Sequence, residues 1–160
     1  MIEAMEKVKN KHPEALLLML GRGGSYQEAC DYVKEHKLDN NIILPGFISE
    51  EDISMYFSLT DFFVSPMNDT VQDWARCPSK LYMYLPYRKP IITCKIGEPY
   101  NVLGDEGFYY RPSSSDSLAA EMEKLLESGK TEIAINSLEH EWTFRTKEFD
   151  KWLHPNLKND

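Results

Sequence analysis

The sequence has few cysteines and no long apolar stretch. Its 160 residues include only Cys30, Cys77 and Cys94, an odd number without metal-type spacing. Such a set does not make a disulfide framework and favours a reducing compartment. The longest unbroken apolar run, residues 15–20, falls far short of the about 20 residues that cross a bilayer. We therefore expect a chain without a transmembrane segment and with a cytoplasmic location.

Export and catalytic signatures are missing as well. The first residues carry the acids Glu3 and Glu6 where a secretory signal carries bases, so we expect no export signal. No nucleophile elbow, P-loop or dinucleotide fingerprint occurs, which leaves hydrolase, kinase and dehydrogenase readings without their residues. The histidines are scattered and lack metal-ligand spacing, so we expect no metal site: His12, His36, His140 and His154.

Basic charge is also scarce. Acids number 26 against 18 bases, giving a formal net charge of −8. This balance opposes binding to nucleic acid, because like charge repels a phosphate backbone. A small anionic ligand stays compatible, since a few backbone amides and one or two bases act at short range.

What is present is the composition of a globular domain, with 42% hydrophobic and 12% aromatic residues. Apolar periodicity predicts helices that alternate with short buried strands. Expected strands are residues 15–20, 42–44, 62–65, 90–94 and 107–110. Expected helices open at residue 1, behind a Ser25–Glu28 capping box, behind Ser49, around residue 81, behind Ser114, and over residues 138–153. Residues 66–77 and 97–104 are expected to be loops.

This alternation is typical of an α/β fold with a doubly wound parallel sheet. We expect residues 1–160 to form a single domain. Such a fold normally opens with a strand, whereas this chain opens with a helix. We therefore expect the first strand, and the ligand-side loop behind it, to be missing.

Ligands of open parallel sheets bind beyond the carboxyl ends of the strands, so the strand-to-helix loops hold the candidate site. The glycine-rich loop at residues 21–24 leads into a helix start, where free amides can face an anion. Ser79 and Lys80 open another helix. Plain glycine turns and solvated lysines fit these patterns equally well. Asp69 and Asp73 are interpreted as solvated loop acids, because two isolated carboxylates without histidine make a poor metal site.

Four segments carry a resemblance to a known family. They read LLLMLGRGG at residues 16–24, ILPGFISEEDISMYF at 43–57, DFFVSP at 61–66 and PSKLYMYLPYRKPII at 78–92. In this order, with the stretch from Trp142 onward, they resemble the C-terminal domain of group 1 glycosyltransferases of family four. The resemblance covers nearly the whole chain.

The resemblance implies the Rossmann-like C-terminal half of a GT-B enzyme. Its donor would be a nucleotide diphosphate sugar and its transfer retaining, to a glycan or lipid-linked acceptor in polysaccharide biosynthesis. No further cofactor is implied, and a peripheral membrane contact of the full enzyme is compatible. The terminal helix at 138–153 would pack toward a missing N-terminal domain. Without that half the chain is expected to be inactive, and its catalytic residues stay unknown.

The resemblance also implies a set of donor-binding residues. The glycine loop Gly21, Arg22, Gly23 and Gly24 would lie near the donor, and Gly46 with Phe47 against its base. Ser79 and Lys80 would lie near the diphosphate and the sugar. The family usually has an acidic residue for the ribose three positions after this lysine, where the sequence has Met83. Its partner eight residues earlier is Ala75, so both glutamates of the family pattern are absent.

Two other readings stay open. A non-catalytic interaction or regulatory module could keep the fold and lose the donor site, which Met83 favours. A receiver domain shares the alternating pattern but needs an acid at the end of a central strand, and residues 62–65 end without one.

Overall fold

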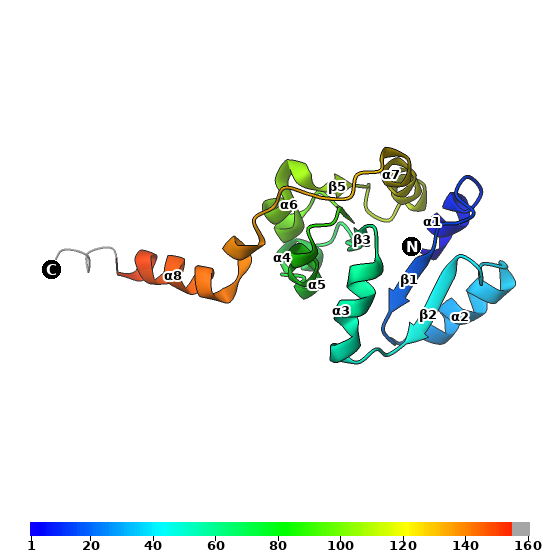
Figure 1. Ribbon diagram of the computed structural model, residues 1–160, viewed down its shortest axis with the longest axis horizontal. Coiled ribbons are helices and arrows are strands. Elements are labelled where there is room, and N and C mark those ends of the chain that lie inside the picture. Colours follow the sequence, from blue (N-terminus) through cyan, green and yellow to red (C-terminus); the bar gives the residue numbers. More distant parts are fainter. Residues whose placement is uncertain (155–160) are drawn as a thin grey trace.

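The computed structural model describes residues 1–154 (Figure 1). Within them the strands are β1 Leu17–Leu20, β2 Ile42–Gly46, β3 Phe63–Val64, β4 Ile91–Thr93 and β5 Phe108–Tyr109. The helices are α1 Ile2–Val8, α2 Tyr26–Glu35, α3 Glu50–Leu59, α4 Val71–Ala75, α5 Ser79–Tyr84, α6 Gly97–Leu103, α7 Ser115–Ser128 and α8 Trp142–Leu153. Three 3-10 turns, η1 Leu85–Tyr87, η2 Gly104–Glu106 and η3 Ser137–His140, complete the order. Among these helices, none combines the length and apolar character that crossing a bilayer requires.

All strand pairs are parallel, as the alternation predicted, but they form two sheets instead of one. β1 pairs with β2, while β3, β4 and β5 form a second sheet in that order. A shift in register interrupts the β1–β2 ladder between Leu18 and Leu20. In the described part of the chain, β1 and β3 do not pair with each other.

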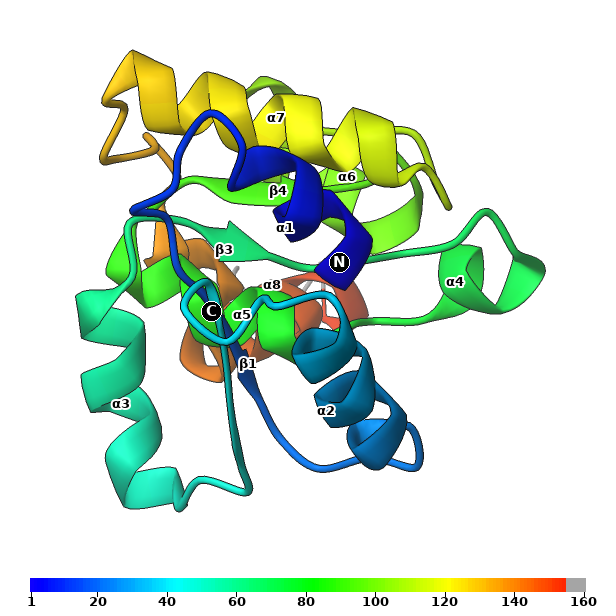
Figure 2. The same cartoon turned by 90° about the vertical axis from the view of Figure 1, so that its right-hand side faces the viewer.

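Helices cover both faces of the sheets. Along β4, Ile92 packs into the cluster that α1 and α7 share, whereas Ile91 packs into the cluster of α5 and α6. This is the alternation of side chains that a strand imposes. Figure 2 shows α1 and α7 side by side over one face and α5 beneath the other. The chain is therefore wound on both sides of its strands, as the sequence predicted.

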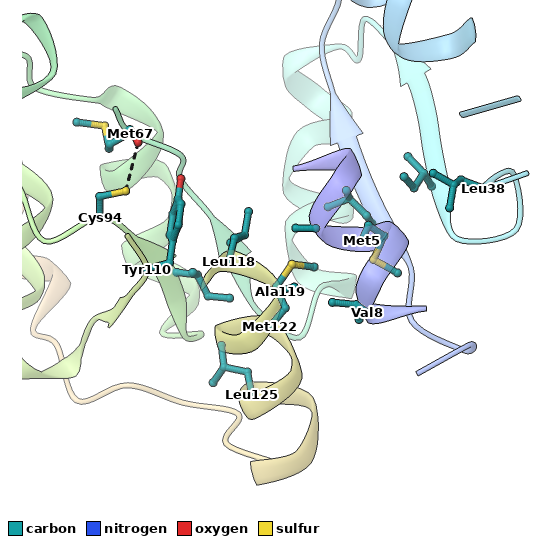
Figure 3. Close-up of a cluster of buried hydrophobic side chains, with 14 of the residues drawn as sticks. Met5, Val8, Leu38, Met67, Cys94, Tyr110, Leu118, Ala119, Met122 and Leu125 are labelled. Atoms are coloured by element: carbon teal, nitrogen blue, oxygen red, sulfur yellow. Dashed lines mark hydrogen bonds between the residues drawn. The ribbon is translucent and has the colours of Figure 1, made fainter. Parts of the chain in front are cut away.

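The larger core joins α1 to α7 and reaches both sheets (Figure 3). Met5 and Val8 of α1 are fully buried and lie toward Ala119 and Met122 of α7. At the far side of this core, the Cys94 thiol donates to the Met67 carbonyl oxygen over 3.2 Å. Burial raises the pKa of Cys94, which keeps this thiol neutral.

Several predicted elements change in the structure. The expected loops 66–77 and 97–104 each contain a helix, α4 and α6. Ser25 precedes α2 but makes no side-chain cap hydrogen bond, so the predicted capping box is wrong. The expected terminal helix at 138–153 is broken at Glu141 into the turn η3 and the helix α8. The caps Ser49 and Ser114 are confirmed by hydrogen bonds from the amides of Asp52 and Ser117.

The helix α8 extends away from the rest of the molecule (Figure 1). Before it, Ile133 is buried in the smaller core, and its N–H donates to the Arg88 carbonyl over 2.7 Å. Every side chain of α8 is exposed, including Trp142 at 86% and Trp152 at 74%. The aromatic side chains of α8 therefore form exposed surface.

Candidate functional site at the carboxyl ends of the strands

The glycine loop meets the end of β2. The N–H of Gly21 donates to the carbonyl oxygen of Gly46 over 2.8 Å. Both glycines have positive φ, +117° and +81°, which side chains rarely adopt. The two loops that the resemblance assigns to the donor therefore form one continuous surface.

The side chain of Tyr26 holds the end of β2 by a hydrogen bond. Its hydroxyl donates to the Leu44 carbonyl over 2.8 Å, and burial raises the pKa of Tyr26, so the donor proton is kept. A side chain at position 46 would meet the Tyr26 hydroxyl 3.5 Å away. The Arg22 guanidinium lies 5.4 Å from the centre of the Tyr26 ring, a cation–π arrangement. Gly46 is thus required by its positive φ, whereas a Cβ there would make only an ordinary contact with Tyr26.

Phe47 follows directly and is 80% exposed. Gly21, Arg22, Gly23 and Gly24 are exposed as well. An uncovered aromatic ring beside an accessible glycine backbone can stack on a planar base while the amides bind an anion.

The residues predicted on α5 lie elsewhere. Ser79, Lys80 and Met83 are exposed on this short helix, which is anchored by the buried Leu81 in the smaller core. Met83 is 42% exposed. Within residues 1–154 no hydrogen bond joins α5 to the glycine loop, so the two groups of predicted residues are not directly linked.

A groove of about 510 Å³ lies next to the glycine loop, where Ser25 at the start of α2 is part of its lining. The ends of β1, β3 and β5, together with α1, α2 and α7, supply its walls. Its lining residues are Met1, Ile2, Glu3, Met19, Ser25, Glu28, Ala29, Tyr32, Pro66, Asn68, Tyr110, Ser113, Ser114, Ser115 and Leu118. None of the nine predicted donor-binding residues is among them. The groove nevertheless occupies the position where ligands of open parallel sheets bind.

Sequence reasoning missed the polar groups of this groove. Asn68 follows β3, and Ser113 follows β5 with a φ of +57°. Their side chains face each other, Ser113 Oγ lying 3.4 Å from Asn68 Oδ1. Their positions directly after two strands could have identified Asn68 and Ser113 from the sequence. The neighbouring Ser114 was interpreted only as a helix cap. The carboxylates Glu3 and Glu28 line the same groove and oppose an anion there.

The loop acids of residues 66–77 have structural roles. Asp73 is buried, contrary to the expectation of a solvated acid, and accepts from the Asn68 N–H over 2.8 Å. It also pairs with Arg76 Nε at 2.8 Å. Asp69 accepts from the Trp74 indole over 2.8 Å. Over the described residues, no three His, Cys, Asp or Glu side chains gather as metal ligands would.

The sequence profile of the family described as Glycosyl transferases group 1 matches residues 1–141. The chain therefore belongs to this family, which is the one that its segments resemble. No curated protein sequence matches it significantly. The match ends one residue before α8 begins.

Solved glycosyltransferases share the fold. The pneumococcal O-GlcNAc transferase GtfA, solved with UDP and GlcNAc, has a TM-score of 0.68 at 16% identity, covering 96% of this chain and 31% of that one. HepE from Anabaena, solved with UDP, has 0.69 at 17%, covering 95% and 44%. TarM from S. aureus, solved with UDP and glycan ligands, has 0.71 at 16%, covering 99% and 32%. The chain thus spans less than half the length of these relatives.

Proposed function

We propose that this chain is the donor-binding part of a retaining glycosyltransferase and binds a nucleotide diphosphate sugar. The contact between the loop that follows β1 and the last residue of β2 carries the proposal. The Gly21–Gly46 hydrogen bond of 2.8 Å unites a glycine backbone, which suits a phosphate, with the exposed ring of Phe47, which suits a base. Similar solved proteins contain UDP, so a uridine diphosphate sugar is the donor to test first.

The proposed binding mode uses two surfaces. The amides of Gly23 and Gly24 face the diphosphate side, with the Arg22 guanidinium close by, while the Gly21 N–H stays bound to the Gly46 carbonyl. Phe47 lies against the base. Lys80 and Ser79 on α5 receive the diphosphate and sugar from the opposite side. Met83 leaves the ribose without a carboxylate partner.

Transfer itself needs a second half that holds the acceptor. The chain spans 31% of GtfA and 44% of HepE, so most of each relative lies outside its match. We propose that the whole protein transfers a sugar to a glycan or lipid-linked acceptor in the cytoplasm, for polysaccharide biosynthesis. The present chain binds donor weakly and transfers none.

Chemical-shift mapping with UDP-glucose tests the binding mode. We expect a dissociation constant in the millimolar range, about −4 kcal/mol, with shifts confined to residues 21–24, 46–47 and 79–80. Equal concentrations of uridine serve as a control that lacks the diphosphate and should move residues 46–47 alone. Shifts centred on Asn68 and Ser113 would relocate the site to the groove and contradict the assignment.

A second candidate is a non-catalytic interaction or regulatory module. Met83 and Ala75 occupy the two positions where the family usually has glutamates, which favours a lost donor site. This candidate is supported if UDP-, GDP- and ADP-sugars all leave the spectrum unchanged at concentrations well above the millimolar range.

A further inference from the structure

The strand β2 contains an extra residue near its end. Leu18 pairs with Ile43, and the next pair in the ladder is Leu20 with Gly46. From one pair to the next, β1 advances by two residues and β2 by three. A β-bulge of this kind bends the strand and re-aims the chain that follows. The bulge therefore sets the direction in which the chain leaves β2, and with it the position of Phe47.

Tyr26 contacts both this bulge and the glycine loop from the start of α2. Its hydroxyl donates to the Leu44 carbonyl over 2.8 Å, inside the bulge. Its backbone N–H donates to the Gly23 carbonyl over 3.1 Å. The Arg22 guanidinium lies over its ring, 5.4 Å from the ring centre. One half-buried side chain is thus joined to both parts of the proposed donor surface.

Arg22 needs such a contact because the loop around it offers little else. Its side chain is exposed, and in the described chain it has no ion pair with a carboxylate. The amides of Gly23 and Gly24 have no backbone partner within residues 1–154 and can face an anion. A long side chain loses rotamer freedom when it binds a ligand, which weakens binding. A ring that already holds the guanidinium beside these amides reduces that loss.

We propose that Tyr26 is a positioning residue of the donor site: its ring orients Arg22 toward the diphosphate, and its hydroxyl holds the bulge that places Phe47 against the base. This role rests on the proposed function. Tyr26 acts through Arg22 and the end of β2, and it fixes the two contacts relative to each other. A fixed spacing suits a ligand in which the diphosphate and the base are covalently joined, in preference to a free phosphate.

Titrations of the full chain with UDP-glucose and with uridine, followed by NMR, separate the two contributions. Tyr26→Phe keeps the ring and loses the hydrogen bond to Leu44. We expect it to weaken both ligands by the same factor, about fivefold for one neutral hydrogen bond. Tyr26→Leu loses the ring as well and should weaken UDP-glucose by about a further two- to fivefold, with no further effect on uridine.

A third substitution shows whether the ring acts through Arg22. When Arg22→Ala is added to Tyr26→Phe and to Tyr26→Leu, the two double variants should bind UDP-glucose equally. Tyr56→Leu is the matched control, because Tyr56 is a half-buried tyrosine of α3 without a side-chain hydrogen bond in the described part of the chain. It should change neither affinity. Tyr26→Met, whose unbranched side chain adapts to irregular space, replaces Tyr26→Leu where that variant does not fold.

Ring-current shifts provide a readout without ligand. The side-chain protons of Arg22 should resonate upfield of those of a free arginine in the original chain and in Tyr26→Phe, and at the free position in Tyr26→Leu. Free-arginine shifts in the original chain would mean that the ring does not hold Arg22, and would overturn the proposal.

The binding outcomes distinguish the two proposals. If the original chain binds UDP-glucose with the expected shifts and folded Tyr26→Phe and Tyr26→Leu bind it equally well, the donor site stands and the positioning role of Tyr26 is wrong. If the original chain binds no UDP-glucose, the donor proposal fails and the role of Tyr26 fails with it. Equal loss in Tyr26→Leu and Tyr56→Leu would mean a general effect of losing a tyrosine, which also overturns the role.

Discussion

Asn41 holds the turn that leads into β1. Its buried side-chain amide donates to the Pro13 carbonyl over 2.8 Å and to the Ala15 carbonyl over 3.0 Å. We expect Asn41→Ala to lower the free energy of unfolding by about 1–3 kcal/mol, since two acceptors lose their donor. Urea denaturation measures this. Asn10→Ala, at an exposed position without a side-chain hydrogen bond, is the matched control, and equal effects of the two changes would contradict the prediction.

In the proposed binding mode, Met83 takes the place of an acid that would bind the ribose. We expect Met83→Glu to tighten UDP-glucose binding about tenfold, because one charged hydrogen bond contributes about 1.5 kcal/mol. Calorimetry compares it with Met55→Glu, which adds the same charge at an exposed methionine of α3. If both variants weaken binding in a folded protein, the assignment of α5 to the donor site is wrong.

His140 links η3 to its surroundings. Its ring lies 5.9 Å from the Tyr82 ring, and its Nδ1 accepts from Arg145 Nη2 at 3.1 Å. Burial, and then the charge of Arg145, lower the pKa of His140 below 6.5, while Glu139 and Glu98 oppose this shift. The contact is therefore fully present above pH 6.5, and it is lost as the pH falls through the lowered pKa, because the detached histidine binds the proton more readily.

Histidine and amide chemical shifts measured against pH follow this loss. We expect the amides of η3 and the start of α8 to change with the His140 ring, with a midpoint below pH 6.5. His140→Gln, which has no titrating ring, should remove this transition. A midpoint above pH 6.5 would contradict the stated direction of the pKa.

The sequence predicted the roles of some single residues and missed those of others. Glycines at 21 and 46 were recognised because a glycine behind a strand marks a turn, and both turn out to need positive φ. The contact between them could not be predicted, since it depends on how β1 registers with β2. Asn68 and Ser113 were missed for a similar reason, because only the folded chain brings them to one groove.

At the scale of elements, α7 followed the rules of helix ends most closely. Ser114 begins it with a side-chain cap, and Gly129 ends it in the left-handed conformation at φ +62°. We expect Gly129→Ala to lower the free energy of unfolding by about 1 kcal/mol, the cost of that φ for a residue with a Cβ. Thermal unfolding measures it. Gly24→Ala, which has open space and no positive φ, should have no comparable effect.

The helix α6 was missed because its sequence contains strong turn signals, whereas the five residues of α4 are too few to show helical periodicity. Gly97, Pro99 and Gly104 predict a loop, yet Pro99 fits the first turn of α6, where its missing N–H is unused. A Cβ at Gly97 would lie 2.8 Å from the Trp74 carbonyl oxygen, so this glycine lets α6 approach α4. Tertiary packing of this kind has no local signature, whereas the periodic apolar face of α7 does.

At the scale of the whole molecule, the packed core ends before the helix α8 begins. Ile133 is buried in the smaller core, whereas no side chain of α8 is buried. The family match, too, ends before Trp142. The body and α8 are therefore separate in packing, and the aromatic residues of α8 contribute surface instead of core.

Removal of residues 142–160 tests this separation. We expect the free energy of unfolding to stay within about 0.5 kcal/mol of its original value, since exposed positions contribute little. Ile133→Ala is the positive control and should cost about 2–5 kcal/mol, because it empties a buried site. Urea denaturation of the original chain, the truncated chain and the Ile133→Ala variant measures these free energies of unfolding. The dependence on urea concentration should have the same slope in all three. A loss of more than ~1 kcal/mol on truncation would mean that α8 packs on the body in solution, and that its aromatic face is not free for another surface.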